Sequence, residues 1–205
     1  MNAATPAHGL ARILRSLNGD RGYGFALLGV CALLAVPEVF GESARQAMAF
    51  DRSALAEGQW WRFLTAHFVH LDAAHALLNG FGVVLMWALF ARDYSPLRWL
   101  AIYLFSSLCI SAGLWLFDPG VTNYVGASGA LHGVMSAGTL AHLRRRDLDG
   151  WILAVFIVVK LIYEQWNGQL PFNESGVPVV VNAHLYGALG GLALAAAMKP
   201  RSEPL

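Results

Sequence analysis

The sequence predicts an all-α polytopic membrane protein with six transmembrane helices in one domain. Of its 205 residues, 57% are hydrophobic and only 13% are charged, whereas about a quarter of the residues in an average soluble domain are charged. Six apolar stretches are long enough, or nearly so, to span about 30 Å of hydrocarbon. They lie at about 23–40, 73–91, 96–117, 128–143, 151–166 and 183–198.

The basic residues predict how these helices are oriented. Ten of the fourteen Lys and Arg residues lie on one predicted side of the membrane. They are Arg12, Arg15, Arg21, Arg92, Arg98, Arg144, Arg145, Arg146, Lys199 and Arg201. Because basic residues concentrate in cytoplasmic segments, we expect both termini in the cytoplasm and the 41–71 connection outside. The chain then divides into a cytoplasmic segment (1–22), a six-span domain (23–198) and a cytoplasmic tail (199–205).

The connections carry helix start signals and one interfacial segment. Asp72 is placed to cap the second helix, and Ser95 with Pro96 to begin the third. The fourth helix is short for a full crossing, so we expect the loop at 118–127 to dip into the protein. In the long first external loop, the segment 57–70 contains Trp and Arg, which favour the membrane–water interface. We expect this segment to lie in the headgroup layer.

One hydroxyl lies among glycines at the start of the fourth helix, in the stretch Gly126-Ala127-Ser128-Gly129-Ala130-Leu131-His132-Gly133. Another backbone can approach Ser128 closely, because Gly126 and Gly129 carry no side chain. The N–H groups of a first helical turn have no intrahelical partner and can stabilise an oxyanion. Ser128 is therefore a candidate nucleophile. The alternative is a packing helix of small residues with an incidental serine, since short glycine motifs are common.

The sixth helix supplies a candidate base. Ionisable side chains within membrane spans are costly and usually face a cavity or a partner. His184 opens this helix, followed by Gly187 and Gly191. If these glycines pack against those of the fourth helix, His184 approaches Ser128, and a serine with a histidine in reach is the minimal nucleophile–base pair. Taken alone, His184 also fits a hydrogen-bonded packing residue.

The second helix carries two candidate oxyanion donors. His75 and Asn79 are four residues apart and share one helix face. Their N–H groups can therefore point at the same tetrahedral oxyanion. Upstream, we interpret His67 and His70 as a wet, structural histidine cluster.

Neither a metal nor another cofactor is expected. The histidines could in principle surround zinc, but the sequence has no His-Glu-x-x-His pair. No acidic residue lies in the outer halves of the second, fourth or sixth helices to act as a metalloprotease base. In the fifth helix, we interpret Lys160 and Glu164 as a mutually compensating pair, with a proton relay as the alternative. We expect no nucleic-acid partner.

Together these residues resemble the rhomboid family of intramembrane serine proteases, from about residue 22 to 198. Three motifs and a matching run in the sixth helix carry the resemblance. They are Trp61-Arg62, His70-x4-His75-x3-Asn79, Gly126-Ala127-Ser128-Gly129 and Ala183-His184-x2-Gly187-x3-Gly191. The resemblance implies a six-transmembrane-helix rhomboid-like bundle with a long interfacial first external loop.

The resemblance also implies roles for the site residues. Ser128 and His184 would form a dyad with no carboxylate as third member. His75, Asn79 and the Ser128 backbone N–H would bind the oxyanion, while His70 and Arg62 would support the site. In many rhomboids an aromatic residue one turn after the serine stacks on the catalytic histidine; this chain has His132 there. We expect His132 to pack beside His184 as a neutral imidazole.

Within the family, the short chain and the Ser-Gly-x-Leu-His-Gly run are similar to the rhombosortase subgroup. That similarity implies exported bacterial substrates, each with a Gly-Gly-containing C-terminal segment, a single membrane helix and a basic tail. It implies the bacterial inner membrane as the location. Two alternatives remain: a rhomboid-like protein that binds clients without cutting them, and a small transporter that uses Lys160 and Glu164.

Overall fold

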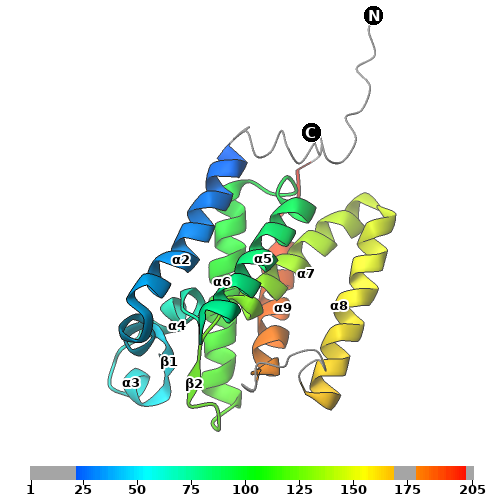
Figure 1. Cartoon of the computed structure of the whole chain (residues 1–205). Coiled ribbons are helices and arrows are strands. Elements are labelled where there is room, and N and C mark those ends of the chain that lie inside the picture. The colour runs from blue at the N-terminus through cyan, green and yellow to red at the C-terminus, as the bar shows by residue number, and fades with distance from the viewer. Residues whose placement is uncertain (1–21, 169–178, 202–205) are drawn as a thin grey trace, which may run out of the picture.

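The computed structural model describes residues 22–168 and 179–201. Within these ranges, one long helix corresponds to each of the six predicted apolar stretches (Figure 1). The helices are α2 (Tyr23–Met48), α5 (Ala73–Phe90), α6 (Pro96–Phe117), α7 (Ser128–Arg145), α8 (Leu148–Asn167) and α9 (Val181–Ala196). Except for Gly22, the predicted N-terminal segment lies outside the described residues, and so do the last four residues of the tail.

Helices α7 and α9 form the centre of the bundle, and both pack against α6. They approach closely because their contact face consists of glycines. A Cβ atom placed on Gly187 or Gly191 would collide with the backbone of Gly129 or Gly133 on α7. Small residues at a helix interface allow this backbone-to-backbone packing in membranes. The predicted meeting of the two glycine faces is therefore present in the structure.

The predicted helix starts are confirmed at two positions. The Asp72 carboxylate accepts a hydrogen bond from the His75 backbone N–H at 2.8 Å, which caps α5. The Ser95 hydroxyl oxygen accepts one from the Arg98 N–H at 3.4 Å, and Pro96 is the first residue of α6. Each cap satisfies a backbone donor that would otherwise lack a partner.

Helix α2 is longer than the sequence predicted. The first apolar stretch was expected to end at Phe40, but helical structure continues to Met48 through a kink at Gly41. Gly41 has a φ of 51° and a non-helical ψ, a conformation that glycine adopts without steric cost. The polar residues after the kink therefore form a second helical piece, which hydropathy alone assigns to a loop.

The first external loop is folded and packed. It contains strand β1 (Phe50–Asp51) and the short helices α3 (Arg52–Ala56), α4 (Arg62–Thr65) and η2 (Ala66–Phe68). β1 pairs in antiparallel fashion with β2 (Asn123–Tyr124), in the loop that precedes α7. Phe50 and Tyr124 face each other in this register and are both buried. The loop at 118–127 thus dips into the protein as expected, and it is held there by the first external loop.

The arrangement is that of an integral, multi-pass membrane protein. Among the described residues, α2, α5 and α6 are each long and apolar enough to cross a membrane, and α9 is a shorter apolar helix. Large apolar side chains also point away from the bundle, including Phe25 on α2, Leu77 on α5 and Val159 on α8. Exposed apolar surface of this extent indicates contact with lipid. Helix α7, in contrast, buries mostly Gly, Ala, Ser and Thr at the centre.

Candidate active site

Ser128 is the first residue of α7, at the point where the inserted loop becomes helix. Gly126 makes this junction possible, because its φ of 117° is in the region that favours glycine. A Cβ at Gly126 would also lie 2.8 Å from Cε1 of the His75 ring. The loop is fixed by a hydrogen bond from the Gly126 N–H to the Ala66 carbonyl at 3.0 Å. Ser128 is thus presented at a helix N-terminus with His75 close by.

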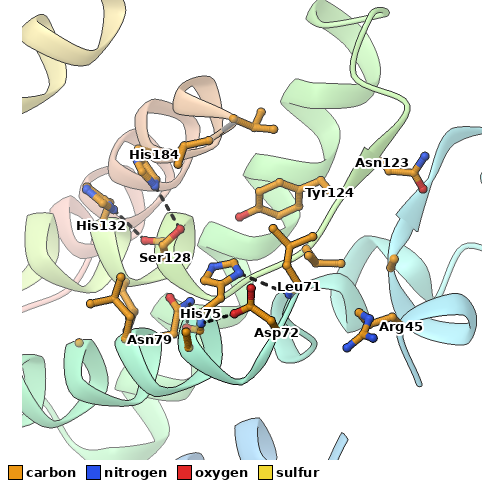
Figure 2. Close-up of a pocket in the computed structure, with 18 of the residues that line it drawn as sticks. Arg45, Leu71, Asp72, His75, Asn79, Asn123, Tyr124, Ser128, His132 and His184 are labelled. Atoms are coloured by element: carbon orange, nitrogen blue, oxygen red, sulfur yellow. Dashed lines mark hydrogen bonds between the residues drawn. The ribbon is translucent and has the colours of Figure 1, made fainter. Parts of the chain in front are cut away.

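His184 lies on the facing turn of α9, and its ring contacts Ser128. The distance between Ser128 Oγ and His184 Nε2 is 3.1 Å (Figure 2). This hydrogen bond joins residues 56 positions apart in the chain. The imidazole is buried, with 7% of the residue exposed. The structure therefore brings the candidate nucleophile and the candidate base together.

The other nitrogen of His184 contacts a carboxylate. His184 Nδ1 lies 3.0 Å from Oε2 and 3.1 Å from Oε1 of Glu164 on α8. Glu164 is also paired with Lys160 Nζ at 2.5 Å, as the sequence predicted. The structure differs here from the expected dyad without a carboxylate. The sequence does not indicate this contact, because Lys160, one turn away, already accounts for the charge of Glu164.

His132 stacks on His184. The two ring centroids are 4.1 Å apart and the planes differ by 16°, as expected from the position of His132 one turn after Ser128. His132 Nδ1 lies 2.7 Å from the Ser128 carbonyl oxygen, which can only accept, so Nδ1 carries the proton. His132 Nε2 is then an unprotonated, buried nitrogen with no hydrogen-bond partner among the described residues.

His75 and Asn79 reach the same cavity from α5. Figure 2 shows both side chains on the α5 side of Ser128. The Leu71 backbone N–H donates to His75 Nδ1 at 3.4 Å, which leaves Nε2 as the protonated nitrogen and a donor. The Asn79 amide donates to the His75 carbonyl at 3.0 Å within its own helix. The amide nitrogen carries a second N–H, which remains available to an oxyanion.

These residues line one cavity of about 1180 Å³, bounded by α5, α7, α8 and α9. Its polar lining includes His75, Asn79, Ser128, His132, Lys160, Glu164 and His184. Apolar side chains such as Met86, Met135 and Phe156 also line it. A cavity with a few convergent polar groups in an apolar wall is typical of a binding or active site.

The expected wet cluster of His67 and His70 is wrong in one respect, because both residues are fully buried. His67 Nε2 donates to Ser111 Oγ at 3.1 Å, and burial lowers the pKa of His67 to about 4, so its ring is neutral. The backbone N–H and Nδ1 of His70 both bond Glu38 Oε1, at 3.1 and 3.2 Å. The His70 ring packs edge-on against His75, with centroids 5.2 Å apart. His70 therefore supports His75, through a carboxylate on α2 that sequence analysis did not identify.

Arg62 has a supporting position in the first external loop. Its guanidinium donates to the carbonyls of Ala49 and Gln46, both at 2.7 Å, and to Gln59 Oε1 at 2.9 Å. It thereby ties α4 to the end of α2. The neighbouring Trp60 and Trp61 remain exposed, as an interfacial position requires.

Within the described part of the chain, two groups of side chains have ligand atoms close enough together to hold a metal ion. They are His132, Glu164 and His184 at the cavity, and His142, Asp147 and Asp149 at the other end of α7. In the first group, Glu164 is neutralised by Lys160 and both nitrogens of His184 are engaged. The arrangement favours proton transfer between hydrogen-bonded groups over metal binding.

Comparisons with known proteins agree with this geometry. Residues 57–201 match the Rhomboid domain. The putative rhomboid protease YdcA of Bacillus subtilis is 29% identical over 140 residues, 68% of each chain. Rhomboid protease GluP of the same organism is 29% identical over 150 residues, 73% of this chain and 28% of GluP. The chloroplastic rhomboid-like protein 11 of Arabidopsis thaliana is 28% identical over 143 residues, 66% of this chain and 51% of its own length.

Proposed function

The chain belongs to the rhomboid family, and we propose that it is an intramembrane serine endopeptidase that cleaves membrane-anchored proteins. The observation that carries the proposal is the contact of 3.1 Å between Ser128 Oγ and His184 Nε2 inside a membrane-protein cavity. Two of the relatives are named as rhomboid proteases. They support the same class of activity.

In the proposed mechanism, Ser128 attacks the scissile carbonyl while His184 Nε2 takes the hydroxyl proton. The Oγ–C bond forms, the C–N bond breaks, and His184 returns the proton to the leaving amine. Water then attacks the acyl-enzyme, with His184 again as the base, and releases the new carboxylate and free Ser128.

The developing oxyanion would be bound by three donors: the His75 Nε2–H, the Asn79 amide and the Ser128 backbone N–H. The last has no intrahelical acceptor, because Ser128 opens α7. Preorganised donors in a water-poor cavity stabilise the transition state more than they would in water. Gly129, which follows Ser128, allows α7 to pack closely on α9, because a Cβ there would lie 2.9 Å from the Ala183 carbonyl oxygen.

The proposed substrate class rests on the similarity to the rhombosortase subgroup and on the cost of unwinding a membrane helix. A transmembrane helix must unwind before a carbonyl reaches Ser128, because its backbone groups are internally bonded. Glycine-rich segments unwind at a lower cost, because glycine has a low helix propensity. We propose rhombosortase-like substrates, which carry a Gly-Gly segment followed by a single helix and a basic tail. The expected location is the bacterial inner membrane, with both termini cytoplasmic.

The experiment is cleavage of such an anchored reporter in vesicles that contain the purified protein. We expect cleavage by the wild type, none by Ser128→Ala, and normal cleavage by the matched variant Ser136→Ala, which changes another buried serine of α7. Equal cleavage by the wild type and Ser128→Ala would contradict the serine mechanism. Cleavage only of reporters without glycine would contradict the substrate class.

A further inference from the structure

We propose that Glu164 of α8 is a positioning residue that completes a Ser128–His184–Glu164 triad. The inference rests on the proposed function and adds a residue to it. It assigns to Glu164 the task of holding His184 in the tautomer and orientation that can accept the Ser128 proton. Glu164 itself touches neither Ser128 nor the substrate position.

The hydrogen bonds define the tautomer. A carboxylate can only accept, so the His184 nitrogen between the two Glu164 oxygens must carry a proton. Nε2 of His184 is then unprotonated, and it is this atom that lies 3.1 Å from Ser128 Oγ. The opposite tautomer would place a proton on Nε2 and leave it unable to take another from Ser128.

The environment of Glu164 explains why it remains an acceptor. Only 2% of the residue is exposed, and a lone buried carboxylate would be neutralised by protonation. Lys160 Nζ, at 2.5 Å from Oε1, compensates the charge from one turn away on the same helix. The second oxygen stays available to His184 at 3.0 Å. A pair that served only to neutralise itself would not need a histidine in contact with both oxygens.

His132 cannot perform this task. It contacts His184 face to face, and its proton is donated to the Ser128 carbonyl. Stacking fixes the plane of the His184 ring but does not distinguish Nδ1 from Nε2. The carboxylate of Glu164 is the contact that makes this distinction.

The test uses a fluorophosphonate probe, which needs no known substrate. Ser128 Oγ attacks phosphorus, fluoride leaves, and the serine proton passes to His184. The maximal labelling rate (kinact) and the half-saturating concentration (KI) separate chemistry from binding. In Glu164→Gln, the Lys160 ammonium takes the amide oxygen, and the NH₂ group faces His184 Nδ1. This favours the wrong tautomer.

We expect Glu164→Gln to lower kinact by about 100-fold or more with KI unchanged, because loss of the orienting carboxylate in a comparable triad costs about 10⁴ in turnover. Glu164→Asp keeps an acceptor-only group one methylene short and should recover part of the loss. As a matched control, Asp149→Asn changes another carboxylate of α8 that contacts a histidine, His142 Nδ1 at 2.9 Å. It should label at the wild-type rate.

The double variant Lys160→Met/Glu164→Met separates positioning from charge compensation. It removes both charges together, so no uncompensated ion is buried, and thermal unfolding identifies any loss of the fold. We expect the double variant to remain folded and to have a lowered kinact. Wild-type kinact in a folded double variant, or in Glu164→Gln, would overturn the inference. Absence of Ser128 labelling in the wild type would overturn the proposed function instead, and the inference with it.

Discussion

The glycine contact between α7 and α9 sets the distance between Ser128 and His184. A single methyl group added to one of these glycines should therefore push the two helices apart. Gly187 lies one turn after His184 on α9. A Cβ at this position would lie 2.7 Å from the Gly129 carbonyl carbon and would collide with its oxygen. Carbon atoms in contact are normally about 3.5–4.0 Å apart. Gly187→Ala should therefore separate the two helices by roughly 1 Å.

A separation of that size removes the hydrogen bond between Ser128 and His184. The bond is 3.1 Å long, and a contact beyond about 3.6 Å is no longer a hydrogen bond. Misplacement of a reacting group by about 1 Å can reduce the rate about 100-fold. We expect Gly187→Ala to lower the fluorophosphonate labelling rate by this factor.

The assay needs controls for folding. Gly29→Ala changes a glycine of α2 whose added Cβ would have no neighbour within 4 Å, and it should label normally. Gly191→Ala creates a similar collision one turn further from the site, against Gly133. It should lower the unfolding temperature as much as Gly187→Ala but reduce labelling less. A stable Gly187→Ala protein with the wild-type labelling rate would show that the glycine contact does not set the distance between Ser128 and His184.

Three further predictions concern single groups. Asn79→Ala should lower turnover about 10²-fold with little change in KM, measured on the anchored reporter, because one oxyanion donor is lost. His132→Tyr should keep measurable labelling, because an aromatic ring can still stack on His184, whereas His184→Phe should be inactive. Reporters fused after Arg146 should be cytoplasmic and one at Asp51 external, as the basic residues predict.

Each of these predictions has a contrary outcome. Unchanged turnover in Asn79→Ala would leave His75 and the backbone N–H as the oxyanion donors. An inactive His132→Tyr together with an active His184→Phe would transfer the role of base to His132. An external reporter after Arg146 would reverse the proposed orientation.

The helices and the Ser–His contact were predictable because they depend on local patterns. Three such patterns can be read directly in the sequence. They are the apolar stretches, the helix caps at Asp72 and Ser95, and the glycines four residues apart. The meeting of Ser128 with His184 followed from pairing two glycine faces. The stacking of His132 followed from its place one turn after Ser128.

What could not be predicted depends on contacts between distant segments that carry no matching sequence pattern. The β1–β2 pairing is two residues long, too short to produce an alternating pattern. Glu38 and Glu164 each lie in an apolar stretch, which signals a required partner. The sequence does not show that these partners are His70 and His184, on other elements. For Glu164, the nearby Lys160 supplied a sufficient local explanation and concealed the contact across helices.

The most direct test of the account is the site of covalent labelling in the purified membrane protein. After reaction with a fluorophosphonate, peptide mapping by mass spectrometry should find the phosphonyl group on Ser128, and Ser128→Ala and His184→Phe should remain unlabelled. Labelling at another serine, or equal labelling of Ser128→Ala, would contradict the claim that Ser128 and His184 form the reactive pair.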